Sequence, residues 1–227
     1  MNENIVVFSR RLVGLTSMDV TLCPPARLGD VRRAAEKATT IVFLESLFLQ
    51  SPSPTHVELL SAIKDGVRLI GGASAGALRA VELSRFGMLG IGHVFNAYSS
   101  GAITDDAEVA ALLCPITYQY QTIPLVNIRY ALRRLADDGF DFDIACKAFI
   151  AAQRLHYSHR TIETLLSTWK AYSTTQRQLL LDALRSPEND IKAKDSINAV
   201  AFAIRGNQKE LNDKVTNKSS HSTFFSI

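Results

Sequence analysis

Residues 67–76 read Val-Arg-Leu-Ile-Gly-Gly-Ala-Ser-Ala-Gly, and this segment is the most informative one about the fold. Its first four residues have the composition of a buried strand, whereas residues 77–85 have helical composition. The stretch therefore predicts a strand that turns abruptly into a helix. Continuous β-branched and aromatic runs at 5–8 and 40–44 predict two further buried strands, and each precedes a candidate helix.

Buried strands that alternate with helices are typical of a parallel sheet. The fold class predicted here is α/β, with a small parallel sheet flanked by helices and a carboxyl-terminal helical region. We expect an α/β domain over 1–123, a helical region packed on it over 124–205, and a frayed polar tail over 206–227. Two capping boxes are predicted at helix starts, one from Thr55 with Glu58 and one from Ser173 with Gln176.

Composition narrows the classes of function. The 227 residues are 47% hydrophobic and 21% charged, which suffices for a buried core. A net charge of +3 does not argue for nucleic acid or a membrane surface, and no apolar run approaches the roughly 18 residues of a membrane span. The three cysteines are far apart in sequence and form no disulfide or metal pattern, so we expect a reducing, cytoplasmic setting without metal or cofactor.

The run from Gly72 to Gly76 matches the G-x-S-x-G pattern of a nucleophilic serine between a strand and a helix. In this context we expect Ser74 to adopt a strained backbone and to hold its hydroxyl out from the fold. The Ala75 N–H then points at a developing oxyanion, and Gly71 with its neighbours leaves room. Two other interpretations remain open: a tight joint that needs glycines for packing, and a loop that binds phosphate or carboxylate without chemistry.

A serine nucleophile needs a base, and His56 and Glu45 are the candidates. His56 opens the helix before the Ser74 strand, and Glu45 stands at the carboxyl end of the strand before it. Each has an ordinary alternative as a solvated surface residue. Arg79 is either a ligand for an anion or the partner of Glu82 on its own helix face.

Four residues further along the chain are also candidates for ligand binding. Asp105 and Asp106 lie near the site in the expected fold, although such a pair is more often the acidic first turn of a helix. Asn127 and Arg129 follow Pro124 at the start of the next helix. Arg129 is either a clamp for a carboxylate or a plain surface arginine.

Several of these blocks, in this order, resemble the signature of TfuA-like proteins. The likeness covers about residues 4 to 166 and is carried by the following segments: 24–30, His56 with Glu58, 71–83, 86–92 with Phe95, Tyr98 and Gly101, 105–110, 124–129, and Tyr157 with Arg160 and Thr161. Leu113-Cys114 departs from the pattern, because a histidine is expected in that segment. The helices after about residue 170 match no pattern.

The resemblance implies a partner of a YcaO enzyme, which activates peptide amides with ATP for conversion to thioamides. TfuA-like proteins are understood to release sulfide from a thiocarboxylated ThiS-type carrier and to help YcaO engage its precursor peptide. The first hypothesis is therefore a hydrolase in which Ser74 attacks the thiocarboxylate or orients water against it, with His56 or Glu45 as base. In this hypothesis Arg79 or Arg129 holds the anionic tail of the carrier. The second is a non-catalytic scaffold that presents peptide or carrier to YcaO. The third is a patatin-like serine acyl hydrolase, whose amino-terminal Gly-rich loop the sequence lacks.

Overall fold

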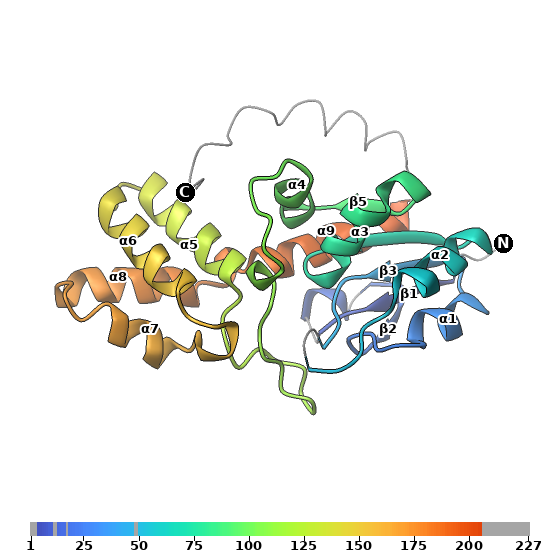
Figure 1. Ribbon diagram of the computed structural model, residues 1–227, viewed down its shortest axis with the longest axis horizontal. Helices are drawn as coiled ribbons and strands as arrows, with labels where there is room; N and C mark the ends of the chain where they lie inside the picture. The colour runs from blue at the N-terminus through green and yellow to red at the C-terminus, as the bar shows by residue number, and fades with distance from the viewer. Residues whose placement is uncertain (1–3, 11–12, 17, 48–49, 206–227) are drawn as a thin grey trace. The chain divides into compact units, whose positions relative to one another are not determined.

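The computed structural model describes residues 4–10, 13–16, 18–47 and 50–205 (Figure 1). The chain forms two compact units. The first, here called the sheet unit, contains the described residues up to Thr104 and those from Ala193 onward. The second, here called the helical unit, contains Asp105–Lys192. The tail predicted over 206–227 lies outside the described residues.

The sheet unit is built on five parallel strands in the order β2-β1-β3-β4-β5. The strands are β1 (Ile5–Phe8), β2 (Thr21–Cys23), β3 (Thr40–Phe43), β4 (Arg68–Gly72) and β5 (Leu89–Ile91). In this register Phe8 lies opposite Phe43, and Phe43 lies opposite Gly71. The predicted parallel α/β fold is therefore confirmed. Strands β2 and β5 were not predicted, because three residues are too few to show a strand pattern.

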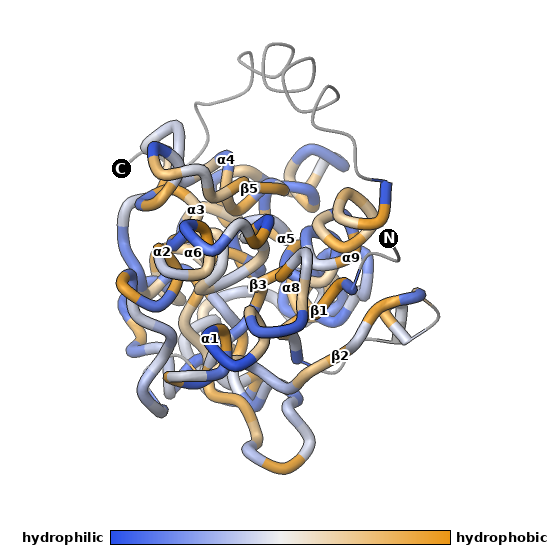
Figure 2. Tube along the Cα trace, turned by 90° about the vertical axis from the view of Figure 1, so that its right-hand side faces the viewer, coloured by the Kyte–Doolittle hydropathy of each residue, from blue (hydrophilic) through white to orange (hydrophobic). Residues whose placement is uncertain are grey.

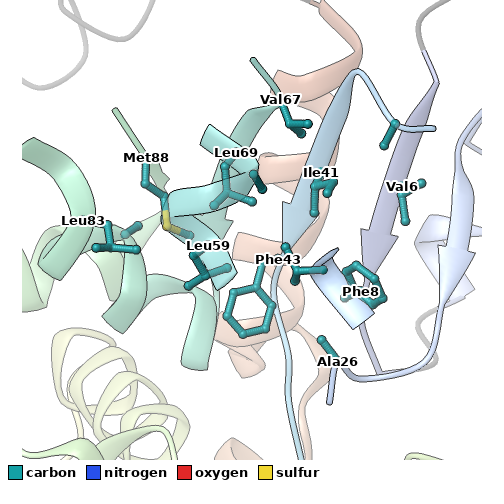
Figure 3. Packing of buried hydrophobic residues seen from close by; sticks show 14 of the residues in the cluster. Val6, Phe8, Ala26, Ile41, Phe43, Leu59, Val67, Leu69, Leu83 and Met88 are labelled. Carbon is teal, nitrogen blue, oxygen red and sulfur yellow. The ribbon is translucent and has the colours of Figure 1, made fainter. Parts of the chain in front are cut away.

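Helices cover both faces of this sheet. They are α1 (Asp30–Ala35), α2 (His56–Lys64), α3 (Ala75–Leu83), α4 (His93–Ser99) and α9 (Ile191–Arg205), with short 3₁₀ turns η1 (Val13–Leu15) and η2 (Ser84–Phe86). One hydrophobic cluster joins the sheet to α1, α2 and α3, and Figure 3 shows 14 of its residues. A second cluster joins the opposite face to α9 through Ala199, Val200, Phe202 and Ala203. In Figure 2 the trace along β1 and β3 is mostly hydrophobic, whereas α1 carries a hydrophilic stretch.

The helical unit contains α5 (Leu125–Asp137), α6 (Phe142–Gln153), α7 (Ile162–Thr168) and α8 (Thr174–Arg185), with 3₁₀ turns η3 (Asp106–Glu108), η4 (Tyr157–His159) and η5 (Pro187–Asn189). Helix α5 packs against α6 and α8, and α6 packs against α7. The capping box of Ser173 and Gln176 at the start of α8 is confirmed. The helical carboxyl-terminal region, α5 to α9, agrees with the predicted fold class.

The boundaries of the two units differ from the predicted ones. Residues 105–123 belong to the helical unit, and the chain returns to the sheet unit at Ala193, within α9. The return follows from composition, because the small and apolar residues of α9 are those that complete the second hydrophobic cluster. In the described part of the chain, no helix is long and apolar enough to cross a membrane.

The predicted capping box at the start of α2 is wrong in one half. The Thr55 hydroxyl accepts the Glu58 N–H at 3.2 Å, as predicted. The Glu58 carboxylate instead accepts the N–H groups of Gly29 and Arg32, both at 3.0 Å. A carboxylate from α2 therefore satisfies amides at the start of α1 and ties the two helices together.

Candidate functional site

The chain turns from β4 into α3 through a three-residue turn centred on Ala73. The Ser74 N–H donates to the Gly72 carbonyl at 2.7 Å, and Ala73 has a φ of 62°. A hydrogen bond between residues two apart around a positive φ is the arrangement of a γ-turn. The strained residue is thus Ala73, while Ser74 has a φ of −134°. The left-handed φ therefore falls on Ala73, one residue before Ser74, whose ψ is −123°.

The glycines at this turn are explained by close packing. A Cβ on Gly76 would lie 1.8 Å from the Phe43 carbonyl oxygen, and one on Gly71 would lie 2.1 Å from the Gly76 oxygen. A Cβ on Gly72 would lie 2.9 Å from the Ile91 oxygen. Only glycine permits these approaches between backbone segments. The packing interpretation accounts for all three residues, whatever chemistry takes place beside them.

The first turn of α3 leaves one amide available to a ligand. The N–H groups of Ala77 and Leu78 donate to the Ser74 carbonyl at 2.9 and 3.3 Å, and that of Gly76 donates to the Leu44 carbonyl at 3.3 Å. Among the described residues the Ala75 N–H has no acceptor. It is therefore the amide at this helix start that can stabilise a negative charge on a bound group.

The Ser74 side chain does not stand out from the fold, so that prediction is wrong. The residue is 1% exposed, and its hydroxyl has no hydrogen-bond partner among the described residues. Burial follows from the tight turn, because the packing that excludes side chains at Gly71 and Gly76 also encloses the residue between them.

His56, Arg79 and Glu82 form a partly exposed cluster on α2 and α3. Nε2 of His56 lies 2.7 Å from Oε2 of Glu82, and Nη1 of Arg79 lies 2.5 Å from the same oxygen. Partial burial raises the pKa of Glu82, but the hydrogen bonds and charges of Arg79 and His56 outweigh this effect and the pKa is lowered. The alternative in which Arg79 pairs with Glu82 is the one observed. The imidazole of His56 is held by a carboxylate that the predicted site did not include.

Glu45 lies where predicted, just beyond the carboxyl end of β3, and is 2% exposed. Its burial rules out the alternative of a solvated strand end. Two polar residues after β1 were missed: Ser9 and Arg10 are 6% and 7% exposed. The rule that singled out Glu45, a polar residue at the end of a buried strand, applies equally to them. The Ser9 hydroxyl is buried and has no hydrogen-bond partner among the residues that the structure describes.

The remaining predicted residues belong to the helical unit. Asp105 caps η3 by accepting the Ala107 N–H at 2.8 Å, and Asp106 is the exposed first residue of that turn. Asn127 donates to Oδ1 of Asp190 at 2.9 Å and accepts the Lys192 N–H at 3.3 Å. These bonds are structural, and the Asn127 side chain holds the segment that leads into α9.

Arg129 forms a buried ion pair within the helical unit. Its Nη2 donates to Oε1 of Glu108 at 2.5 Å, and its guanidinium lies 4.3 Å from the centre of the Phe149 ring. Glu108 is 3% exposed. The nearby guanidinium of Arg160 donates to the Ala107 carbonyl, and burial lowers its pKa while the charge of Glu108 opposes that shift. Arg129 is thus neither a plain surface residue nor a clamp with a free guanidinium.

A family model of TfuA-like proteins matches residues 45–161, just over half of the chain. The chain belongs to the TfuA-like family. In this TfuA-like protein the matched segment runs from Glu45 to Thr161 and includes Ser74 and all of the predicted site residues, whereas Ser9 and Arg10 precede it. TfuA-like proteins generally partner YcaO proteins in peptide thioamidation. No curated protein matches the sequence.

The described residues of this TfuA-like protein contain no group of three or more His, Cys, Asp or Glu side chains arranged to hold a metal ion. They do outline two cavities. One, of about 440 Å³, lies in the helical unit between the segment 120–124 and Asp190, and the other, of about 820 Å³, lies between α1 and α2. Ser74 lines neither cavity.

Proposed function

We propose that this TfuA-like protein hydrolyses the terminal thiocarboxylate of a ThiS-type sulfur carrier and supplies sulfide to a YcaO enzyme, which thioamidates a ribosomally made precursor peptide. Water and thiocarboxylate are consumed, and carboxylate, hydrosulfide and a proton are formed. The single observation that carries the proposal is the Ala75 N–H beside Ser74, at the carboxyl end of β4, which has no acceptor within the described part of the chain.

In the proposed reaction the Ser74 oxygen attacks the carbonyl carbon of the thiocarboxylate. The carbon–sulfur bond breaks, hydrosulfide leaves, and an ester between Ser74 and the carrier remains for water to hydrolyse. The negative charge that develops on the carbonyl oxygen is stabilised by the Ala75 N–H and by the start of α3. Glu45 or His56 takes the proton from Ser74 and passes it to the departing sulfur, which leaves as hydrosulfide.

One observation favours a second candidate, a scaffold without catalytic activity. Ser74 is 1% exposed, and the glycines around it are explained by packing alone. In that case the turn is a rigid joint, and the protein presents the carrier or the precursor peptide to YcaO. Both candidates keep YcaO as the partner, so only the chemistry at Ser74 separates them.

The test is sulfide release from a thiocarboxylated carrier by wild-type protein and by Ser74→Ala. A nucleophile predicts a loss of roughly 10³-fold or more. The matched control is Ser84→Ala, since Ser84 is exposed and its hydroxyl donates only to the Val81 carbonyl in the last turn of α3. Full activity in Ser74→Ala removes the nucleophile from the mechanism. If thioamidation by YcaO and binding to YcaO are also unchanged, the scaffold is the better description.

A further inference from the structure

We infer that Ser9 and Arg10, at the carboxyl end of β1, form a subsite for the terminal carboxylate or thiocarboxylate of an extended polypeptide tail. The inference rests on the proposed function for the identity of that tail. It adds two residues from a segment that the family match does not cover. It also places the binding site beside β1 and β3, one strand away from the Ser74 turn.

The topology of the sheet points to this position. The chain runs from β1 to β2 on one side, and it then crosses to β3 on the other side of β1. In open parallel sheets this reversal leaves a crevice beyond the carboxyl ends of the two central strands, where ligands bind. The residues at those two ends are Ser9 and Arg10 after β1, and Leu44 and Glu45 after β3.

Backbone hydrogen bonds bring these segments together. The Phe8 carbonyl accepts the N–H groups of Leu44 and Glu45 at 3.0 and 3.1 Å, so the chain after β1 lies alongside the chain after β3. The Leu44 carbonyl in turn accepts the Gly76 N–H from the first turn of α3. The ends of β1 and β3 and the start of α3, which carries the Ala75 N–H, therefore form one continuous edge.

The polar side chains at this edge are buried, and one of them is unpaired among the described residues, which indicates a bound ligand. Ser9, Arg10, Glu45 and Ser46 are all less than 9% exposed, although the strands before them are entirely apolar at this end. An unpaired buried hydroxyl costs free energy in the isolated protein, and a missing partner is the usual reason for one. The Ser9 hydroxyl is such a group. It is the second observation, beside topology, that indicates a bound molecule.

The positive charge of Arg10 favours an anionic ligand. A guanidinium carries five N–H donors, so Arg10 can serve a partner within the fold and still donate to a ligand. The Glu45 carboxylate at the neighbouring strand end would repel an incoming anionic tail, and Arg10 offsets that repulsion. A terminal carboxylate or thiocarboxylate bears a single negative charge and accepts hydrogen bonds from both Ser9 and Arg10.

The test compares two peptides that copy the end of a ThiS-type carrier, one with a free carboxylate and one with a carboxamide. We expect the wild-type protein to bind the carboxylate peptide about tenfold more tightly or better. Ser9→Ala and Arg10→Lys should both reduce this preference severalfold. Ser9→Ala should be at least as stable as wild type, because it removes an unpaired hydroxyl. Arg68→Lys, at the opposite end of β4, is the matched control and should bind as wild type does.

The inference is overturned if the wild-type protein shows no preference for the carboxylate, or if Ser9→Ala retains the preference in full. Its failure can be told apart from failure of the proposed function. If sulfide release is lost in Ser74→Ala but peptide binding is unchanged in Ser9→Ala, only the subsite is contradicted. If peptide binding is weakened in Ser9→Ala but Ser74→Ala releases sulfide at the full rate, only the role of Ser74 as nucleophile is contradicted.

Discussion

Gly76 and Phe43 approach so closely that a Cβ on Gly76 would stand 1.8 Å from the Phe43 carbonyl oxygen. This contact fixes the first turn of α3 against the end of β3. It therefore also fixes the position of Ser74 and of the Ala75 N–H relative to the sheet. The glycine is required for the architecture of the site even if the site has no chemistry.

Replacing Gly76 by alanine should destabilise the protein strongly. The added methyl group meets backbone atoms, which cannot move aside as a flexible side chain can, so we expect a loss of roughly 3 kcal/mol in the free energy of unfolding. Gly101→Ala is the control, because nothing lies within 4 Å of a Cβ there and only its φ of +75° opposes the change. It should cost about 1 kcal/mol. Equal losses in urea denaturation of the two variants would contradict the packing argument.

Removal of the Asp195 carboxylate should loosen the start of α4. Asp195 comes from α9, is 1% exposed, and accepts the N–H groups of His93 and Val94 at 2.8 and 2.7 Å. Asp195→Ala leaves both amides without this acceptor, and we expect a loss of about 2 kcal/mol in stability. Hydrogen exchange at these two amides should accelerate in Asp195→Ala and stay unchanged in Asp65→Asn, an exposed carboxylate at the end of α2. Unchanged exchange in both variants would show that the cap contributes little.

Removing one partner of the ion pair between Arg129 and Glu108 should cost more stability than removing both. Arg129→Met leaves the Glu108 carboxylate buried without its cation, and we expect a loss of about 3 kcal/mol. The double variant Arg129→Met with Glu108→Leu should recover much of that loss, because no uncompensated charge remains. Arg133→Met on the same helix removes an exposed pair with Asp137 and should change stability by less than about 0.5 kcal/mol. A double variant no more stable than the single one would argue against an uncompensated charge as the cause.

The cluster of Glu82, Arg79 and His56 should contribute to stability only above a low pH. Because the pKa of Glu82 is lowered in the folded protein, the carboxylate favours the folded state once pH exceeds the ordinary range for a glutamate. That contribution is lost as pH falls through the lowered pKa. Glu82→Gln should thus be slightly less stable than wild type at neutral pH, by under about 1 kcal/mol given its exposure, and equal to it in acid. Thermal unfolding of both proteins across the pH range measures this, and a pH-independent difference would contradict it.

Local sequence patterns were sufficient to predict the longer strands and helices of the fold. Strands β1 and β3, helix α2 and the strand–turn–helix at Ser74 are marked by uninterrupted apolar runs, caps and glycines that act within a few residues. The short strands β2 and β5 were not predicted, because three residues are too few to show the alternation of a strand and because β5 contains Gly90. Their place in the sheet comes from pairing with β1 and β4.

The candidate site was predicted less completely, because side-chain partners are set by contacts across the chain. Glu58 was assigned to its own helix by spacing, yet its carboxylate binds amides of α1. Arg129 was a candidate for binding a ligand carboxylate, yet its guanidinium is paired with the carboxylate of Glu108. No spacing rule connects Asp195 with His93, which are 102 residues apart.

The sequence by itself determined that a parallel sheet forms and that a small, glycine-flanked turn carries Ser74, since strand and helix preferences and the need for close backbone approach are local properties. The tertiary structure alone decided that this hydroxyl is buried, that strain falls on Ala73, and that polar residues after β1 and β3 share one edge. The physical reason is that burial, strain and hydrogen bonding at a strand end depend on which distant segments pack there, and packing is a property of the whole chain.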